Sequence, residues 1–194
     1  MTRSAAAGAG AAIALEPLMP ADVAPLVGWI GGPDELVQWA GPRLFAWPLT
    51  VAQLEDYVSG AGDVGRLAFK AVPAGAGREQ ARPQPLGICE LGEFGERQRS
   101  AKVCRVLVTP SHRGGGVGRA MVGLLADVAF GEHAVHRLHL NVYSFYAAAI
   151  RAYEAAGFRQ EGLIRDTTRA GDGYWSTVVM AMLEDDWRGA RGRS

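Results

Sequence analysis

The feature that most constrains this chain is a segment in which an apolar strand passes through a proline and clustered glycines into a helix. It reads Arg105-Val-Leu-Val-Thr-Pro-Ser-His-Arg-Gly-Gly-Gly-Val-Gly-Arg-Ala120. Pro110 has no N–H to donate, so it ends the strand. Glycine lacks a Cβ, so its backbone can adopt positive φ and approach a ligand closely. The first N–H groups of the helix have no internal partner and lie at the positive end of its dipole. The segment therefore predicts a phosphate or diphosphate site, flanked by Arg113 and Arg119.

Two other phosphate-binding motifs fit this segment poorly. A P-loop ends in Gly-Lys-Ser/Thr, whereas Gly118 is followed by Arg119 and Ala120. The dinucleotide fingerprint that starts at Gly114 and Gly116 needs a third glycine where this chain has Arg119. A turn that only joins strand to helix is the remaining structural alternative.

Composition bounds the class of protein. The chain has 194 residues, with 20 Lys and Arg against 20 Asp and Glu. This length suits one domain with short tails. The balanced charge provides no basic field, so neither nucleic acid nor a membrane surface is an expected partner. No run of about 20 apolar residues is present, so we expect no membrane-spanning helix.

Cysteine and histidine positions favour structural roles. Cys89 and Cys104 fall in predicted strands, where small buried thiols are expected. His133, His136 and His139 span a helix–strand junction, with no cysteine or carboxylate in ligand rhythm. We therefore expect no metal site.

The sequence predicts that the chain has three parts. The Ala/Gly-rich residues 1–12 predict a disordered leader, residues 13–187 a single domain, and residues 188–194 a flexible tail. Hydrophobic periodicity and turn residues predict helices and strands within the domain. The predicted helices are Ala21–Ile30, a short helix from Pro33 or Asp34 towards Trp39, Val51–Val58, Val117–Phe130 and Tyr146–Ala156. The predicted strands are Ile13–Leu18, Arg66–Val72, Leu86–Phe94, Ala101–Val108, Arg137–Val142, Phe158–Thr168 and Tyr174–Leu183.

This order of elements predicts an α+β architecture. Three successive strands form a meander, and the last two strands flank a Gly-rich hairpin turn at residues 170–173. The order therefore predicts a mixed, mostly antiparallel sheet with helices on both faces, and not a doubly wound parallel sheet. Residues 73–85 are rich in Gly, Pro and charge and predict a long exposed loop.

At this point the chain resembles the GNAT superfamily of N-acetyltransferases. The family's acetyl-CoA motif, Gln/Arg-x-x-Gly-x-Gly/Ala, is similar to Arg113-Gly-Gly-Gly-Val-Gly118. A second family block ends in Tyr-x-x-x-Gly-Phe and is similar to the stretch that closes with Tyr153, Gly157 and Phe158. The last hairpin resembles the branch of ribosomal-protein-alanine and spermidine acetyltransferases. The resemblance covers roughly residues 84–187.

The resemblance implies how acetyl-CoA, the acyl donor, is bound. The central strand that ends at Val108 splays from the next strand near Asn141, and its exposed backbone pairs with the pantetheine amides like an added strand. The diphosphate then lies on the glycine turn. The donor-binding residues so implied are Val106, Leu107, Val108, Arg113, Gly114, Gly115, Gly116, Val117, Gly118, Arg119 and Tyr146.

The resemblance also implies direct attack by an amine in a ternary complex. Tyr153 takes the role of the family's acid, which protonates the leaving thiolate. Glu90 is the first candidate for the base, and Glu93 the second. In a regular strand these two carboxylates point to opposite faces, so at most one reaches the cleft directly. Either is equally explained as a solvated strand residue.

Two positions depart from the family pattern. Tyr146 stands where the family often has an Asn that contacts the donor's arm. Asn141 stands where some relatives have a carboxylate base, so Glu90 or a chain of water molecules must accept the proton. The resemblance places the acceptor cleft near the Trp29–Trp47 region and Tyr174-Trp175, where large aromatic side chains favour an amine with apolar or flat parts.

The expected function is therefore transfer of an acetyl group from acetyl-CoA to a primary amine in the cytoplasm. The acceptor is a small molecule or a protein N-terminus, and a homodimer is compatible with the family. The alternative is a non-catalytic module on the same fold that binds CoA or a partner protein, because fold alone does not fix function. A nucleotide-binding protein is a third alternative.

Overall fold

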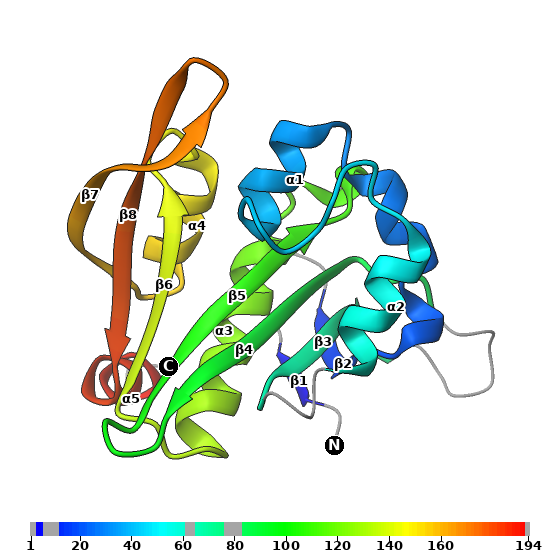
Figure 1. Cartoon of the computed structure of the whole chain (residues 1–194). Coiled ribbons are helices and arrows are strands. Elements are labelled where there is room, and N and C mark those ends of the chain that lie inside the picture. Colours follow the sequence, from blue (N-terminus) through cyan, green and yellow to red (C-terminus); the bar gives the residue numbers. More distant parts are fainter. Residues whose placement is uncertain (1–2, 6–11, 61–64, 76–82, 193–194) are drawn as a thin grey trace.

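The computed structural model describes residues 3–5, 12–60, 65–75 and 83–192. Its strands form one eight-stranded sheet in the order β1-β2-β3-β4-β5-β6-β8-β7 (Figure 1). The strands are β1 Arg3–Ala5, β2 Ile13–Pro17, β3 Leu67–Pro73, β4 Gly87–Gly95, β5 Ser100–Val108, β6 Arg137–Tyr143, β7 Arg159–Ala170 and β8 Gly173–Leu183. The helices are η1 Pro20–Asp22, η2 Ala24–Trp29, α1 Pro33–Ala40, α2 Val51–Ser59, η4 Pro110–His112, α3 Val117–Gly131, α4 Ala147–Ala155 and α5 Glu184–Arg191.

The predicted α+β class and the mostly antiparallel sheet are confirmed. Every neighbouring pair of strands is antiparallel except β5 and β6. Helices cover both faces, with α3 on one and α1 and α2 on the other (Figure 1). Within the described residues no helix has the length and apolar character needed to cross a membrane.

The predicted splay lies between β5 and β6. The two strands pair in parallel only from Ser100–Arg137 to Lys102–His139. Beyond Lys102, β5 continues to Val108 paired with β4 alone, and β6 continues to Tyr143 paired with β8. Figure 1 shows the two strands diverging from that short junction. The sheet therefore opens on one side of β5 over its second half.

A bulge on β5 lies beside this opening. Glu90 pairs with Cys104 and Ile88 with Leu107, so that Arg105 and Val106 together stand opposite one residue of β4. Arg105 has a φ of 52°, a left-handed conformation that costs energy for a residue with a Cβ. In a regular strand position 105 would follow the buried Val103 onto the face covered by α3. The extra residue gives that place to Val106 and keeps a guanidinium out of the apolar core.

Two hydrophobic cores flank the sheet. The larger is built around α3, whose apolar side chains pack on β2, β4 and β5. The Met121 side chain of α3 packs closely against β4 at Gly87, where a Cβ would lie 2.7 Å from both the Leu107 carbonyl oxygen and Met121 Sδ. The smaller core lies under η2, α1 and α2 and includes Ile88 and Leu107 from the sheet. Together these cores hold both faces of β5 and fix its open edge in place.

The predicted helix over Ala21–Ile30 is wrong in type. Two short 3-10 helices, η1 and η2, take its place. Pro25 lacks the N–H that an α-helix would need at that position, and its ring would clash with the preceding turn. A buried ion pair of 2.8 Å between Asp22 Oδ1 and Lys70 Nζ instead fixes this segment to β3.

Other predicted elements are found within a few residues of their expected bounds. Thr50 caps α2, since its Oγ1 accepts a 3.3 Å hydrogen bond from the Gln53 backbone N–H. The two ends of the chain differ from expectation. Arg3–Ala5 form β1 within the predicted leader, and α5 extends to Arg191 in the predicted tail. Residues 1–2, 6–11 and 193–194, and residues 76–82 of the predicted exposed loop, lie outside the described part.

Candidate functional site

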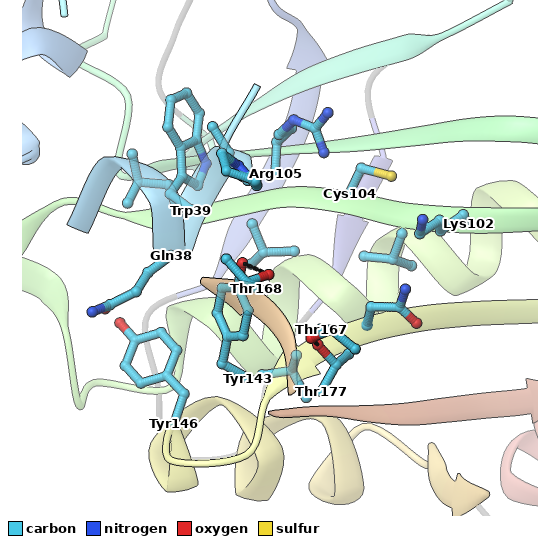
Figure 2. A pocket seen from close by; sticks show the side chains of 18 of the residues that line it. Gln38, Trp39, Lys102, Cys104, Arg105, Tyr143, Tyr146, Thr167, Thr168 and Thr177 are labelled. Carbon is cyan, nitrogen blue, oxygen red and sulfur yellow. Dashed lines mark hydrogen bonds between the residues drawn. The ribbon is translucent and has the colours of Figure 1, made fainter. Parts of the chain in front are cut away.

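A cavity of about 440 Å³ lies where β5 and β6 diverge. Residues 104–107 of β5 form one wall, and residues 141–143 of β6 form the other. Helix α1 contributes Gln38 and Trp39, and α4 contributes Tyr146 and Tyr153. Figure 2 shows Gln38, Tyr143 and Tyr146, which come from elements that are far apart in the sequence, around this cavity. The cavity is therefore a direct consequence of the break in sheet pairing after Lys102.

The glycine turn follows the end of β5. Gly114 and Gly116 have φ values of 79° and 82°, a region that residues with a Cβ rarely adopt. Gly116 is the N-cap of α3, and its carbonyl oxygen accepts a 3.0 Å hydrogen bond from the Ala120 N–H. The N–H groups of Val117, Gly118 and Arg119 therefore fall within the first turn, where an α-helix offers no internal acceptor. Residues 111–116 are exposed, so the turn is open to an anion.

The side chain of Arg113 forms hydrogen bonds within the protein. Its Nη2 donates to the Trp29 carbonyl oxygen at 3.2 Å and to Glu35 Oε1 at 3.0 Å. Its Nε donates to the Val108 carbonyl oxygen at 3.2 Å. These bonds join the turn to η2, α1 and the end of β5. Arg119 is exposed on the first turn of α3.

Tyr153 projects from α4 into the wall of the cavity. Its ring packs near Phe158, with 6.2 Å between ring centroids. Burial, with smaller contributions from Tyr146, Cys89 and Cys104, raises the pKa of the Tyr153 phenol above its ordinary value. The phenol therefore stays protonated at neutral pH and can act as a proton donor facing the cavity.

The two positions that depart from the family pattern both line the cavity. Tyr146 is the N-cap residue of α4 and is exposed, while Asn141 lies on the open edge of β6. In Figure 2 Tyr146 and Gln38 point towards each other across the cavity. The Tyr146 hydroxyl is therefore placed where it can reach a molecule that enters there.

Glu90 is almost fully buried, with 2% of its surface exposed. Its Oε2 accepts a 2.8 Å hydrogen bond from the Tyr57 hydroxyl of α2, and Arg66 Nη1 lies 3.9 Å from the same oxygen. Burial raises the pKa of Glu90, and the Tyr57 hydrogen bond, Arg105 and Arg66 oppose that rise. Glu90 itself is not among the described residues that line the cavity, whereas its neighbour Arg105 is.

Glu93, the second candidate base, is exposed, whereas Glu90 is buried. It has a φ of 49°, its side chain is 60% exposed, and it forms a 2.8 Å ion pair with Lys102. The register of β4 and β5 is shifted between Gly92 and Gly95, so this end of the strand is irregular. The structure thus separates the two candidate carboxylates, one into a buried cluster and one onto the surface.

Several residues in or behind the cavity wall have no role in the sequence-based predictions. Tyr57 pairs with Glu90, and burial together with the Glu90 charge raises its pKa to about 12. Hydroxyl groups line the β7–β8 side, where Thr167 and Thr177 lie 2.6 Å apart and Tyr143 and Thr168 lie 3.0 Å apart. Only Arg105 gave a signal in the sequence, as a charged residue inside an apolar strand. The hydroxyl pairs depend on register, which the sequence alone does not reveal.

Few of the aromatic residues predicted for the acceptor cleft line this cavity. Trp39 lines the cavity, but Trp47, Tyr174 and Trp175 are not among its described lining residues. Trp175 instead packs edge-on against Tyr143 and Phe145, with centroid distances of 5.0 and 5.1 Å. That aromatic group supports the cavity wall from outside.

Comparison with protein families matches residues 64–158 to the acetyltransferase (GNAT) family. A spermidine N(1)-acetyltransferase of Vibrio cholerae is 31% identical over 109 residues, which are 56% of this chain and 62% of that protein. A Bacillus subtilis protein named "Probable N-acetyltransferase YjcK" is 32% identical over 76 residues, 39% of this chain and 42% of that protein. The chain thus matches under two thirds of the length of either relative.

Comparison with solved structures agrees on the fold. A spermidine N-acetyltransferase from Vibrio cholerae, crystallised in complex with CoA and spermine, superposes with a TM-score of 0.75. The match covers 91% of this chain and 98% of that chain at 21% sequence identity. At this identity the superposition speaks for the fold alone.

Proposed function

We propose that this chain, whose residues 64–158 match the acetyltransferase (GNAT) family, transfers an acetyl group from acetyl-CoA to a primary amine. The observation that carries the proposal is the opening between β5 and β6, bounded at one end by the glycine turn and lined by Tyr153. An extended pantetheine arm can pair with the free edge of β5 while its diphosphate meets the N-terminus of α3.

Donor binding is assigned to the backbone of β5 and the turn. In this assignment Val106, Leu107 and Val108 pair with the pantetheine amides. The diphosphate contacts the N–H groups of residues 114–118, and Arg119 adds charge from outside. Arg113 acts differently from a free cation, because its bonds to Val108, Trp29 and Glu35 make it a brace for the turn. Tyr146 contacts the donor's arm through its hydroxyl.

The transfer proceeds by direct attack. The neutral amine forms an N–C bond to the thioester carbonyl carbon, the C–S bond breaks, and the electron pair leaves on the CoA sulfur. Tyr153 gives its proton to that thiolate, and the proton that the new amide nitrogen loses returns through solvent to Tyr153. The proton lost by the attacking ammonium passes through water to Glu90, whose buried carboxylate is a stronger base than an exposed one. Holding both reactants in one cavity supplies much of the rate enhancement.

The acceptor class and the setting complete the proposal. A small-molecule amine suits a cavity of about 440 Å³, which is within the usual range for small ligands. A protein N-terminus is the alternative acceptor, since only the first residues of such an acceptor protein would have to enter the cavity. We place the enzyme in the cytoplasm, where acetyl-CoA is available, and a homodimer is compatible with the free β7 edge of the sheet.

The experiment that tests the function is release of free CoA thiol from acetyl-CoA in the presence of a panel of primary amines. Amine-dependent thiol release above the rate of hydrolysis is the expected result, with the N-acetyl product identified by mass spectrometry. Binding of CoA without turnover on any amine would point to a non-catalytic module, and failure to bind CoA would reject the proposal.

A further inference from the structure

We infer that the acceptor is an amine whose own skeleton carries a carboxylate, and that Arg105 binds that carboxylate. This inference rests on the proposed acetyl transfer and goes beyond it by naming the class of acceptor. It starts from the charges that face the cavity.

One acidic and three basic side chains line the described part of the cavity: Glu35, Arg43, Lys102 and Arg105. Two of them are neutralised by partners. Glu35 forms a 3.0 Å ion pair with Arg113, and Lys102 forms a 2.8 Å ion pair with Glu93. Arg43 and Arg105 remain, and both are cations. The cavity therefore presents an excess of positive charge to a bound molecule.

The buried cluster behind this wall does not remove the excess. Glu90 is near two arginines, Arg66 and Arg105, and both lower its pKa. One carboxylate cannot neutralise two guanidinium groups, and its Oε2 already accepts a hydrogen bond from the Tyr57 hydroxyl. Counting the cluster and the cavity together still leaves more cations than anions.

Arg105 has an unmet hydrogen-bond donor. Its Nε is buried and has no hydrogen-bond partner among the described residues. The bulge with its φ of 52° gives the side chain this position at the divergence of β5 and β6. The protein leaves this guanidinium without a side-chain hydrogen bond among the described residues, and Arg105 lines the cavity, so a ligand that enters can supply the missing acceptor. A carboxylate matches the planar fork of a guanidinium better than any neutral group.

A polyamine fits this cavity poorly. Such a molecule carries two or more ammonium groups at neutral pH, and the group that is not acetylated would need a carboxylate nearby. Among the described lining residues the only carboxylate is Glu35, which Arg113 already neutralises. Like charges placed together in a partly buried site repel strongly, so spermidine should be selected against.

The test compares acceptors that differ only in that carboxylate. L-phenylalanine and L-phenylalaninamide form one matched pair, and a tripeptide with glutamate or glutamine at its second position forms the other. Spermidine is the polyamine arm. We expect the carboxylate member of at least one pair to have a kcat/KM about 30-fold or more above its amide, and spermidine to be the poorest acceptor. The two pairs distinguish a free amino acid from a peptide N-terminus.

A variant then assigns the preference to Arg105. Arg105→Gln should reduce kcat/KM for the preferred acceptor about 30-fold or more and bring it level with its amide twin, while KM for acetyl-CoA stays unchanged. Arg105→Lys, which keeps the charge but loses the fork, should recover part of the discrimination. Arg97→Gln is the matched control, since Arg97 is exposed in the β4–β5 turn away from the cavity.

Three results would overturn the inference while leaving acetyl transfer intact. These are equal rates within both pairs, a preference for spermidine, or an Arg105→Gln effect confined to the KM for acetyl-CoA, which would assign the arginine to the donor. A chain that acetylates no amine would instead reject the proposed function itself. If Arg105→Gln fails to fold, the wild-type comparison of the matched pairs still decides the acceptor class.

Discussion

The two halves of β5 differ in what lies on either side of them. From Ser100 to Lys102 the strand is paired on both edges, with β4 and with β6. From Cys104 to Val108 it is paired with β4 alone, and its other edge faces a cavity. The first half holds the two parts of the sheet together, and the second half offers backbone groups to a ligand. One strand thus serves structure at its start and binding at its end.

Among substitutions that test this difference between the two halves of β5, the largest effect on activity is expected at Tyr153, which faces the open half. Tyr153→Phe removes the proton donor while keeping the ring, so kcat should fall about 100-fold or more with little change in CoA affinity. Steady-state kinetics with the best acceptor and a calorimetric titration of CoA measure the two quantities. Tyr174→Phe is the control, because Tyr174 is 61% exposed and outside the described cavity lining. Unchanged kcat for Tyr153→Phe would remove this residue from the mechanism.

The next effect concerns Glu90, which pairs with Cys104 at the boundary between the halves. Glu90→Gln should lower kcat/KM by about 10- to 100-fold at neutral pH and abolish the acid limb of the pH–rate profile. Because burial raises the pKa of Glu90, that limb should lie above the ordinary carboxyl range. Tyr57→Phe removes a hydrogen bond that lowers this pKa, so it should move the limb to higher pH.

Stability gives a second readout at Glu90 with a defined sign. A carboxyl whose pKa is raised on folding contributes stability below its unfolded pKa, and that contribution is lost as pH rises through its folded pKa. The Glu90→Gln side chain does not ionise, so the Tm of this variant relative to wild type should increase as pH rises from the ordinary carboxyl range through the raised folded-state pKa of Glu90. A Tm difference that is constant over this range would show that the folded and unfolded pKa values are equal.

A smaller effect is expected in the glycine turn beyond the open half. Gly116 has a φ of 82°, so Gly116→Ala is strained and disturbs the N–H groups at the start of α3. KM for acetyl-CoA should rise about 10-fold, consistent with a strain of about 1–3 kcal/mol. Gly123→Ala, inside the same helix with nothing within 4 Å of the added Cβ, should leave KM unchanged. Equal KM values for the two variants would place the diphosphate elsewhere.

The smallest effect is expected at Cys104, although it lines the cavity. Burial raises the pKa of its thiol to about 11, so the thiolate is scarce at neutral pH. Direct attack by the amine needs no acyl-cysteine, so Cys104→Ser should change kcat less than about two-fold. Detection of an acetyl group on Cys104 in a quenched reaction would replace direct transfer with a two-step route.

Local chemistry in the sequence predicted most of the fold. The strand before Pro110, the glycine turn and the Thr50 cap are each determined by a few neighbouring residues, and each is confirmed. The α+β class followed from the order of helices and strands. The splay followed from resemblance to a family, because the number of β5–β6 pairs is not visible in either strand alone. Pro25 was present in the predicted first helix and should have excluded an α-helix there.

The site was less predictable because it depends on distant contacts. Tyr57 and Glu90 are 33 residues apart and meet only because α2 packs on β4. The bulge that positions Arg105 is a property of pairing with β4, and the sequence shows only an arginine in an apolar strand. Burial of Glu90 but not of Glu93 likewise follows from the irregular end of the β4–β5 hairpin rather than from either residue.

Amide hydrogen exchange across β5, with and without CoA, tests the central claim most directly. If the donor pairs with the open half of this strand and its diphosphate meets the start of α3, CoA should slow exchange at residues 105–108 and 114–119. Exchange at residues 100–102, already paired on both edges, should not change. If exchange at residues 105–108 and 114–119 is unchanged at saturating CoA, that result contradicts the account.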